Sequence, residues 1–94
     1  MSEVVEPAAS VLVVKEDRRF PFSKGLMAMS LMASGSPPDR SYDLATVLER
    51  KLTERGRLDI ASRELSHLTE EVLLAEEGEV ALRHFRQWRR LDHL

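Results

Sequence analysis

The chain has 94 residues, of which 43% are hydrophobic and 32% charged, and its formal net charge is −2. This balance predicts a single folded domain and excludes wholesale disorder. The absence of cysteine excludes disulfides and thiolate chemistry, and the three histidines lack the helical spacing of metal ligands, so we expect no metal site. Without a membrane-length apolar run or a basic signal-peptide start, the expected compartment is the cytoplasm.

The N-terminal part of the chain predicts a small hairpin. Residues 1–10 contain Pro, Ala and Ser without a useful periodicity and predict a flexible leader, so the single domain is expected over residues 11–94. Residues 11–14 are apolar β-formers, and a polar turn separates them from a second short strand at residues 20–22. Pro21 cannot donate to a ladder, which places that second strand at an edge.

The first predicted helix covers residues 24–34, with Ser23 as its N-cap and Gly35 as its stop. It is apolar nearly all round, so we expect it to be central and covered on several sides. Its methionines, Met27, Met29 and Met32, are expected in the core, with a partner-binding surface as the alternative.

The second predicted helix starts at Ser36 as cap with Pro37 at its first position, and it stops at Gly56. Its expected buried face consists of Tyr42, Ala45, Leu48 and Leu52, while Glu49 points outward. Residues 57–60 then form a short extended piece, which can add a third strand to the hairpin, with Leu58 and Ile60 on one side.

Two further helices are predicted at residues 62–77 and 79–91, separated by Gly78. The first carries a stripe of Leu65, Leu68, Val72 and Ala75, and the second an inner face of Ala81, Phe85 and Trp88. The predicted fold class is α+β and mainly helical, with a small N-terminal hairpin, or three short strands, packed on about four helices.

Two stretches resemble a known family. The opening Val13-x-Lys15, followed by Pro21-Phe22, resembles the start of ATP-cone domains, and residues 21–26 (PFSKGL) with the distant Trp88-Arg89-Arg90 resemble the N-terminal domain of 2-phosphoglycerate kinases. The resemblance covers residues 11–90. It implies an ATP-cone-like fold and a regulatory, non-catalytic module that binds ATP or a related adenine nucleotide under the hairpin. The chain has no G-x-x-x-x-G-K-[ST] phosphate loop, so we expect no kinase activity from it.

The resemblance also implies a nucleotide-binding site. Carried over to this sequence, its residues are Val14, Lys15, Arg18, Arg19 and Lys24. Several lysine and arginine donors that converge on a phosphate suit its charge. A solvated turn, in which Glu16 and Asp17 neutralise part of the cluster, is the alternative interpretation.

The sequence leaves a different function open. Glu16 stands where the resemblance expects an arginine, and its charge would repel a triphosphate. This favours a cone fold without ligand that serves as a protein-interaction or oligomerisation domain. Its partner would be a catalytic kinase domain or another copy of the chain.

The last predicted helix carries an arginine stripe, Arg83, Arg86 and Arg90, with Arg89 beside it. Such a stripe can follow nucleic-acid phosphates. Residues 64–79, however, hold six glutamates and no lysine or arginine, so we expect ion pairs between the two helices rather than a nucleic-acid partner. Phe85 and Trp88 could stack a base, but their place on the buried stripe favours a role as core anchors.

Overall fold

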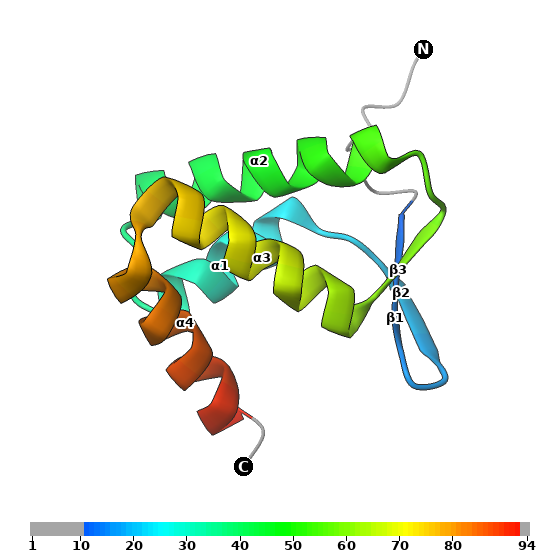
Figure 1. Cartoon of the computed structure of the whole chain (residues 1–94). Coiled ribbons are helices and arrows are strands. Elements are labelled where there is room, and N and C mark those ends of the chain that lie inside the picture. The colour runs from blue at the N-terminus through cyan, green and yellow to red at the C-terminus, as the bar shows by residue number, and fades with distance from the viewer. Residues whose placement is uncertain (1–10, 93–94) are drawn as a thin grey trace.

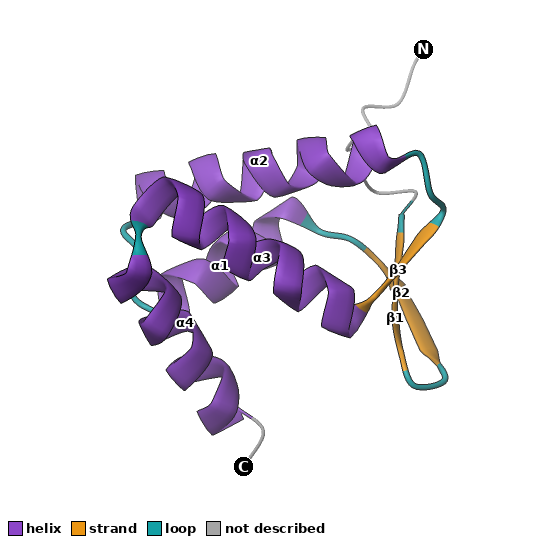
Figure 2. Ribbon diagram, viewed as in Figure 1, coloured by secondary structure: helices purple, strands orange, loops and turns teal. Residues whose placement is uncertain are grey.

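The computed structural model describes residues 11–92 and shows three short strands and four helices (Figures 1 and 2). In chain order these are β1 (Leu12–Lys15), β2 (Arg18–Pro21), α1 (Lys24–Ala33), α2 (Pro38–Arg55), β3 (Asp59–Ala61), α3 (Ser62–Glu77) and α4 (Glu79–Asp92). The predicted class, α+β and mainly helical, is confirmed. The predicted leader lies outside the described residues.

The strands form one mixed sheet in the order β2-β1-β3. β1 and β2 pair antiparallel, with Lys15 opposite Arg18, and β3 runs parallel to β1 on its other side, with Ile60 opposite Val13. The expected third strand is therefore present, and β1 is the central one. Pro21 lies at the end of the edge strand β2, where its missing N–H removes no bond from the sheet interior.

The sheet lies at one end of the molecule, and the helices extend from it (Figure 1). α2 packs against α1 and α3, and α4 packs against α3. The core has two clusters: the first consists of Val11, Val13, Phe22, Leu52 and Ile60, and the second of Leu31, Leu44, Leu48, Val72, Leu73 and Phe85. Met27 and Leu68 pack against both clusters and so join the sheet end of the molecule to the helical end.

α1 begins and ends where the sequence predicts. The Ser23 hydroxyl oxygen accepts a hydrogen bond from the Leu26 N–H at 3.1 Å. At the other end the Gly35 N–H donates to the Met32 carbonyl and the Ser36 N–H to the Leu31 carbonyl, which is the Schellman arrangement, with Gly35 at a φ of 116°.

The expectation that α1 is covered on several sides is wrong. Leu31 is fully buried, but Leu26 is 63% and Met29 60% exposed. The reason is that α1 packs chiefly against α2, so one face of an apolar helix stays at the surface. The prediction that the methionines lie in the core is confirmed for Met27 and is wrong for Met29.

α2 starts one residue later than predicted. Pro37 is its N-cap, in an extended conformation with ψ 152°, and Pro38 is the first helical residue. The physical reason is that a residue before proline is driven out of the α region. Ser36 therefore does not cap the helix. The end of α2 is as predicted, with Gly56 in the left-handed region at a φ of 67°.

The buried face of α2 is wider than the predicted stripe because α1 and α3 cover it from two sides. Ala45, Leu48 and Leu52 are buried as expected, and Ser41 and Leu44 join them. Glu49 is buried as well, so the expectation that it points outward is wrong. Tyr42 is 53% exposed, so its expected place on the buried face is wrong. Leu58 lies before β3 and is 81% exposed, whereas Ile60 is 2% exposed, so these two do not share a side as predicted. Ala75 is likewise exposed on α3, where Leu73 is buried in its place.

Gly78 alone separates α3 from α4, at a φ of 92° that favours glycine. Its N–H donates to the carbonyls of Leu73 and Leu74, which closes α3. Within the described part of the chain, no helix is long and apolar enough to cross a membrane.

Candidate functional site

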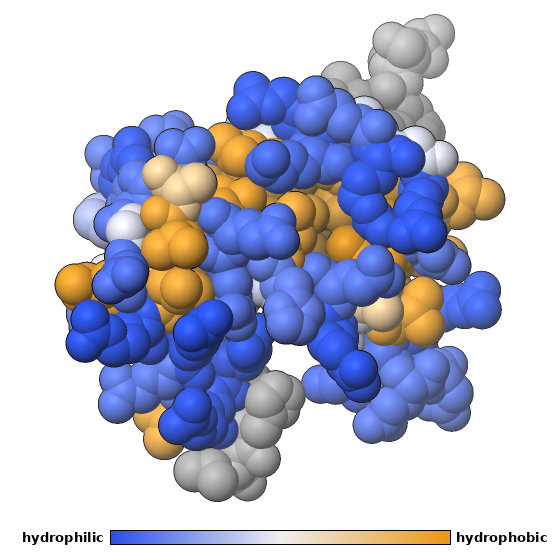
Figure 3. Space-filling model, in the orientation of Figure 1, coloured by the Kyte–Doolittle hydropathy of each residue, from blue (hydrophilic) through white to orange (hydrophobic). Residues whose placement is uncertain are grey.

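A hollow of about 390 Å³ lies where the end of β1, the start of α3 and the last turns of α4 come together. In Figure 3 the surface is hollowed below α3, between α4 and the hairpin. The lining residues are Lys15 from β1, Ser62, Arg63, Ser66 and His67 from α3, and Trp88 and Arg89 from α4. Three cations thus line this hollow, and no carboxylate of the described residues does.

The topology of the sheet brings Lys15 and Arg63 together. Side chains alternate along β1, so Lys15 shares the face of the buried Val13. Because β3 is parallel to β1, the ends of both strands lie at the same edge, with Val14 opposite Ala61. α3 begins at the next residue, Ser62, and its first turn therefore lies beside Lys15.

α4 brings the other half of the lining. The chain turns back at Gly78, and α4 packs against α3. Phe85 is 5% exposed in the second core cluster, and Trp88, half-buried, packs against that cluster with its ring centroid 6.0 Å from that of Phe85. The expected core role is confirmed for Phe85, whereas Trp88 has one side on the core and also lines the hollow.

A second hollow, of about 520 Å³, adjoins the first. It is lined by His67, Glu70, Arg86, Arg89 and Arg90. The two hollows share His67 and Arg89, so together they form one groove, called here the α3–α4 groove.

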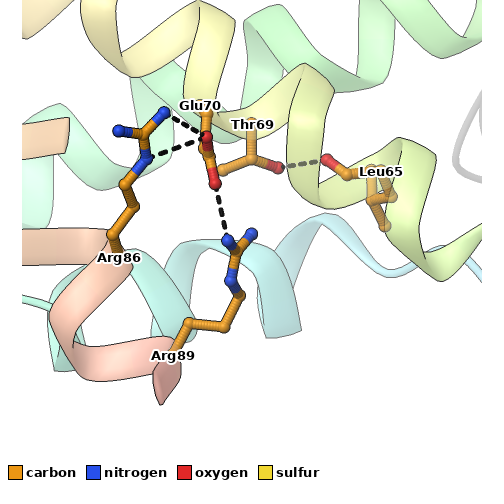
Figure 4. A network of polar contacts seen from close by, with 5 residues as sticks. All are labelled: Leu65, Thr69, Glu70, Arg86 and Arg89. Carbon is orange, nitrogen blue, oxygen red and sulfur yellow. Dashed lines mark hydrogen bonds and ion pairs between the residues drawn. The ribbon is translucent and has the colours of Figure 1, made fainter. Parts of the chain in front are cut away.

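Glu70 is the acidic residue of this groove, and it is only 8% exposed. Its Oε1 accepts hydrogen bonds from Arg86 Nε at 3.0 Å and Nη2 at 2.9 Å, and its Oε2 forms an ion pair with Arg89, whose Nη2 lies 2.7 Å away (Figure 4). Burial would raise the pKa of Glu70, but the hydrogen bonds and charges of Arg86 and Arg89 outweigh it and hold that pKa below its ordinary value. Glu70 is therefore ionised at neutral pH.

The expected pairing between the acidic and the basic helix is confirmed at Glu70. Arg83 and Arg90, from the same arginine stripe, form no ion pair with any carboxylate of residues 11–92. Another ion pair, between Arg40 and Glu77, joins α2 to α3 and raises the pKa of Arg40. The same part of the chain holds no group of three His, Asp or Glu side chains that could bind a metal ion.

The structure separates the residues of the predicted nucleotide site. Lys15 lines the hollow, and Arg18, opposite it in the ladder, shares its face of the sheet. Val14 and Arg19 form the preceding pair and so face the other side. Lys24 starts α1, and it does not line the hollow. A ligand role for these five residues stays a prediction.

Sequence reasoning missed Arg63 as a site residue and read Arg89 and Trp88 as pairing and core residues. Trp88-Arg89-Arg90 was already part of the resemblance, but its position beside Lys15 depends on how α4 packs. The sequence signal that could have identified Arg63 was its position shortly after an extended segment that could join the hairpin as a third strand.

Curated relatives of the chain are 2-phosphoglycerate kinases. The chain is 38% identical over 86 residues to that of Methanococcus maripaludis strain C7, 38% over 81 residues to that of Methanococcus vannielii, and 32% over 71 residues to that of Methanopyrus kandleri. These matches cover 92%, 86% and 76% of this chain but only 28%, 26% and 21% of the relatives. No protein-family model and no solved structure matches. The predicted resemblance is thus confirmed: the chain is similar to a part of the 2-phosphoglycerate kinases that is less than a third of their length.

Proposed function

We propose that the chain is a non-catalytic module that binds ATP or a related adenine nucleotide in the hollow between Lys15 and Arg89 and thereby regulates a kinase. One observation carries this proposal: Lys15, Arg63 and Arg89, from three separate elements, line one hollow without a carboxylate. Convergent cations form an environment that favours a phosphate chain, and the carboxylate that pairs with Arg89, Glu70, lies in the adjoining hollow.

The start of α3 adds further donors for phosphate. Ser62 and Ser66 line the hollow with their hydroxyl-bearing side chains, and the first-turn N–H groups of a helix favour anions. Glu64 is the acidic residue of that turn, but it does not line the hollow. Its carboxylate is paired with Arg55 at 3.6 Å and Arg57 at 3.8 Å. These ion pairs reduce its repulsion of a bound anion.

Trp88 favours a nucleotide over a bare phosphate. Its indole is supported by the core and lines the hollow, and an aromatic face in this setting stacks readily on a base. The volume of about 390 Å³ lies within the usual range of small-ligand sites, roughly 300–1,000 Å³.

The regulatory part of the proposal rests on the relatives. They are named as kinases and are much longer than this chain, so the proposed partner is a catalytic kinase domain in the same or another protein. A nucleotide-sensing role also agrees with the cytoplasmic location expected from the sequence.

The test is an ATP titration followed by the fluorescence of Trp88, which is the only tryptophan of the chain. We expect a saturable change, with and without magnesium, that Lys15→Glu or Arg63→Glu abolishes. Lys51→Glu is the matched control, because it reverses an exposed charge on α2 away from the hollow. Arg19→Glu and Lys24→Glu test the site predicted from the resemblance. A folded chain that shows no change at millimolar ATP contradicts nucleotide binding.

One observation favours the alternative, a protein-interaction or oligomerisation domain. Phe20 is 46%, Leu26 63% and Met29 60% exposed. Phe20 and Leu26 line an apolar hollow of about 140 Å³ that reaches the core residue Phe22. Light scattering at high concentration tests the version with a second copy of the chain. A dimer that Leu26→Glu dissociates supports it, and a monomer removes it.

A further inference from the structure

We propose that Glu70 is a positioning residue for anion binding, which holds the Arg89 guanidinium at the junction of the two hollows in the orientation that a phosphate needs. This inference rests on the proposed function and adds to it the residue that prepares the site. Glu70 itself contacts no ligand in this arrangement and acts through Arg89.

The position of Glu70 relative to the first hollow is the starting point. Arg89 lines both hollows, whereas Glu70 lines only the second one. The carboxylate forms an ion pair with one end of the Arg89 guanidinium, whose Nη2 lies 2.7 Å from Oε2. A guanidinium has five N–H donors, so the remaining ones stay available for an anion.

The carboxylate is itself fixed. Arg86 donates to Oε1 through both Nε, at 3.0 Å, and Nη2, at 2.9 Å, so Glu70 has little freedom to rotate (Figure 4). Arg89 has a second restraint, because its guanidinium carbon lies 5.6 Å from the centroid of the Phe85 ring. A chain of contacts from Arg86 through Glu70 therefore places Arg89 before a ligand arrives.

Two effects of Glu70 on anion binding oppose each other. Its negative charge weakens the positive field of the groove, so removing it would tighten the binding of an anion. Its hold on Arg89 lowers the conformational entropy that binding must still remove, so losing that hold would weaken binding. We expect the second effect to exceed the first, because Glu70 lines the adjoining hollow and not the one that would hold the anion.

The proposal is tested by whether Glu70→Gln weakens or tightens the binding of ATP. We expect Glu70→Gln to weaken ATP binding about threefold to tenfold, although it removes a negative charge from the groove. The matched control is Glu71→Gln, which removes the same charge from the next residue of α3, an exposed one with no ion pair to the described residues. Glu71→Gln is expected to leave affinity unchanged or slightly higher.

A double-mutant cycle separates positioning from a role in the fold alone. In an Arg89→Ala background, Glu70→Gln should cause no further loss of ATP affinity, while it still lowers the melting temperature through Arg86. If the losses of ATP affinity caused by Glu70→Gln and by Arg89→Ala add up in the double variant, the proposal is overturned. Tighter ATP binding by Glu70→Gln would also overturn it. If Glu70→Gln does not fold, Glu70→Asp keeps the charge but shortens the reach to Arg89, and unchanged affinity in that variant overturns the proposal. If the parent chain binds no ATP, the proposed function itself fails, which is a different result.

Discussion

Lys15 and Arg89 line the same hollow, although one ends the first strand and the other lies near the end of the last helix. Two packing relationships bring them together. The parallel pairing of β3 with β1 sets the start of α3 beside Lys15, and the packing of α4 on α3 sets Arg89 there as well. A ligand that bridges both residues would connect the hairpin to α4.

The stacking role of Trp88 gives the first prediction. Trp88→Leu keeps an apolar contact with the core but removes the aromatic face, and base stacking contributes roughly 1–3 kcal/mol. We expect ATP to bind about tenfold more weakly to this variant, while the affinity for inorganic tripolyphosphate, which has no base, stays unchanged. Calorimetric titration measures both ligands without tryptophan fluorescence. An equal loss for the two ligands would place the base elsewhere.

The core gives a stability prediction with an internal control. Leu31 has no exposed surface, so Leu31→Ala leaves a cavity between α1, α2 and α3 and should lower the free energy of unfolding by about 2–5 kcal/mol. Leu26→Ala makes the same truncation on the same helix at a side chain that is 63% exposed, and it should change that free energy by less than about 0.5 kcal/mol. Urea denaturation of the two variants gives the comparison. Equal losses would mean that α1 is covered on both faces.

Most helix ends could be predicted from the sequence because they depend on local signals. The starts of two elements could not, since β2 begins at Arg18 instead of residue 20 and α2 at Pro38 instead of Pro37. Ser23 and the glycines Gly35, Gly56 and Gly78 mark helix ends through their own hydrogen bonds and backbone angles. Which faces are buried could not be predicted equally well, because that depends on the neighbours of each helix. The exposure of Met29 and Tyr42 follows from the packing of α1 and α2, which no local signal contains.

Some residues of the candidate site could likewise be predicted from local signals, and others could not. Lys15 could be identified because it stands in a short motif. Arg63 and Arg89 could not, since their approach to Lys15 needs the strand order and the direction in which α4 leaves Gly78. The groove is a tertiary feature, because its residues lie far apart in the sequence and meet only through the strand order and the packing of α4 on α3.

Substitution of glycine by alanine should have opposite effects on the free energy of unfolding at Gly56 and at Gly25. Gly56 has a φ of 67°, where a Cβ is unfavourable although none of its surroundings would clash with it. Gly56→Ala should therefore lower the free energy of unfolding by about 1 kcal/mol. Gly25 lies in the first turn of α1, and a Cβ there would meet its nearest atom at an ordinary 3.8 Å, so Gly25→Ala should raise that free energy by up to about 1 kcal/mol. Thermal melts measure both, and a common sign would contradict the assigned backbone angles.

The hairpin turn stores a similar strain at Glu16. Glu16 has a φ of 58°, the only positive φ of a non-glycine residue among residues 11–92. Glu16→Gly relieves this strain and should raise the free energy of unfolding by a few tenths to about 1 kcal/mol. It also removes a negative charge from the residue next to Lys15, so ATP affinity should rise as well. Glu16→Gln is the control for charge, since it should raise affinity without the gain in stability.

The pH dependence of stability follows from Glu70. The pKa of Glu70 is lower in the folded chain than in an unfolded one, so the unfolded state binds the proton more readily. The stability that this group contributes is therefore fully present above the unfolded value, about 4.3, and is lost as the pH falls below it through the folded pKa.

The variant that isolates this contribution is Glu70→Gln. At neutral pH it should lower the free energy of unfolding by about 1–3 kcal/mol, because it removes the charge-assisted hydrogen bonds from Arg86 and the ion pair with Arg89. Below pH 4 the difference between parent and variant should shrink, since the parent's carboxyl group becomes protonated. Urea denaturation at a series of pH values measures it, with Glu71→Gln expected to follow the parent throughout. A difference that stays constant from pH 7 to pH 3 would mean that the arginines do not hold an ionised Glu70 in the folded chain.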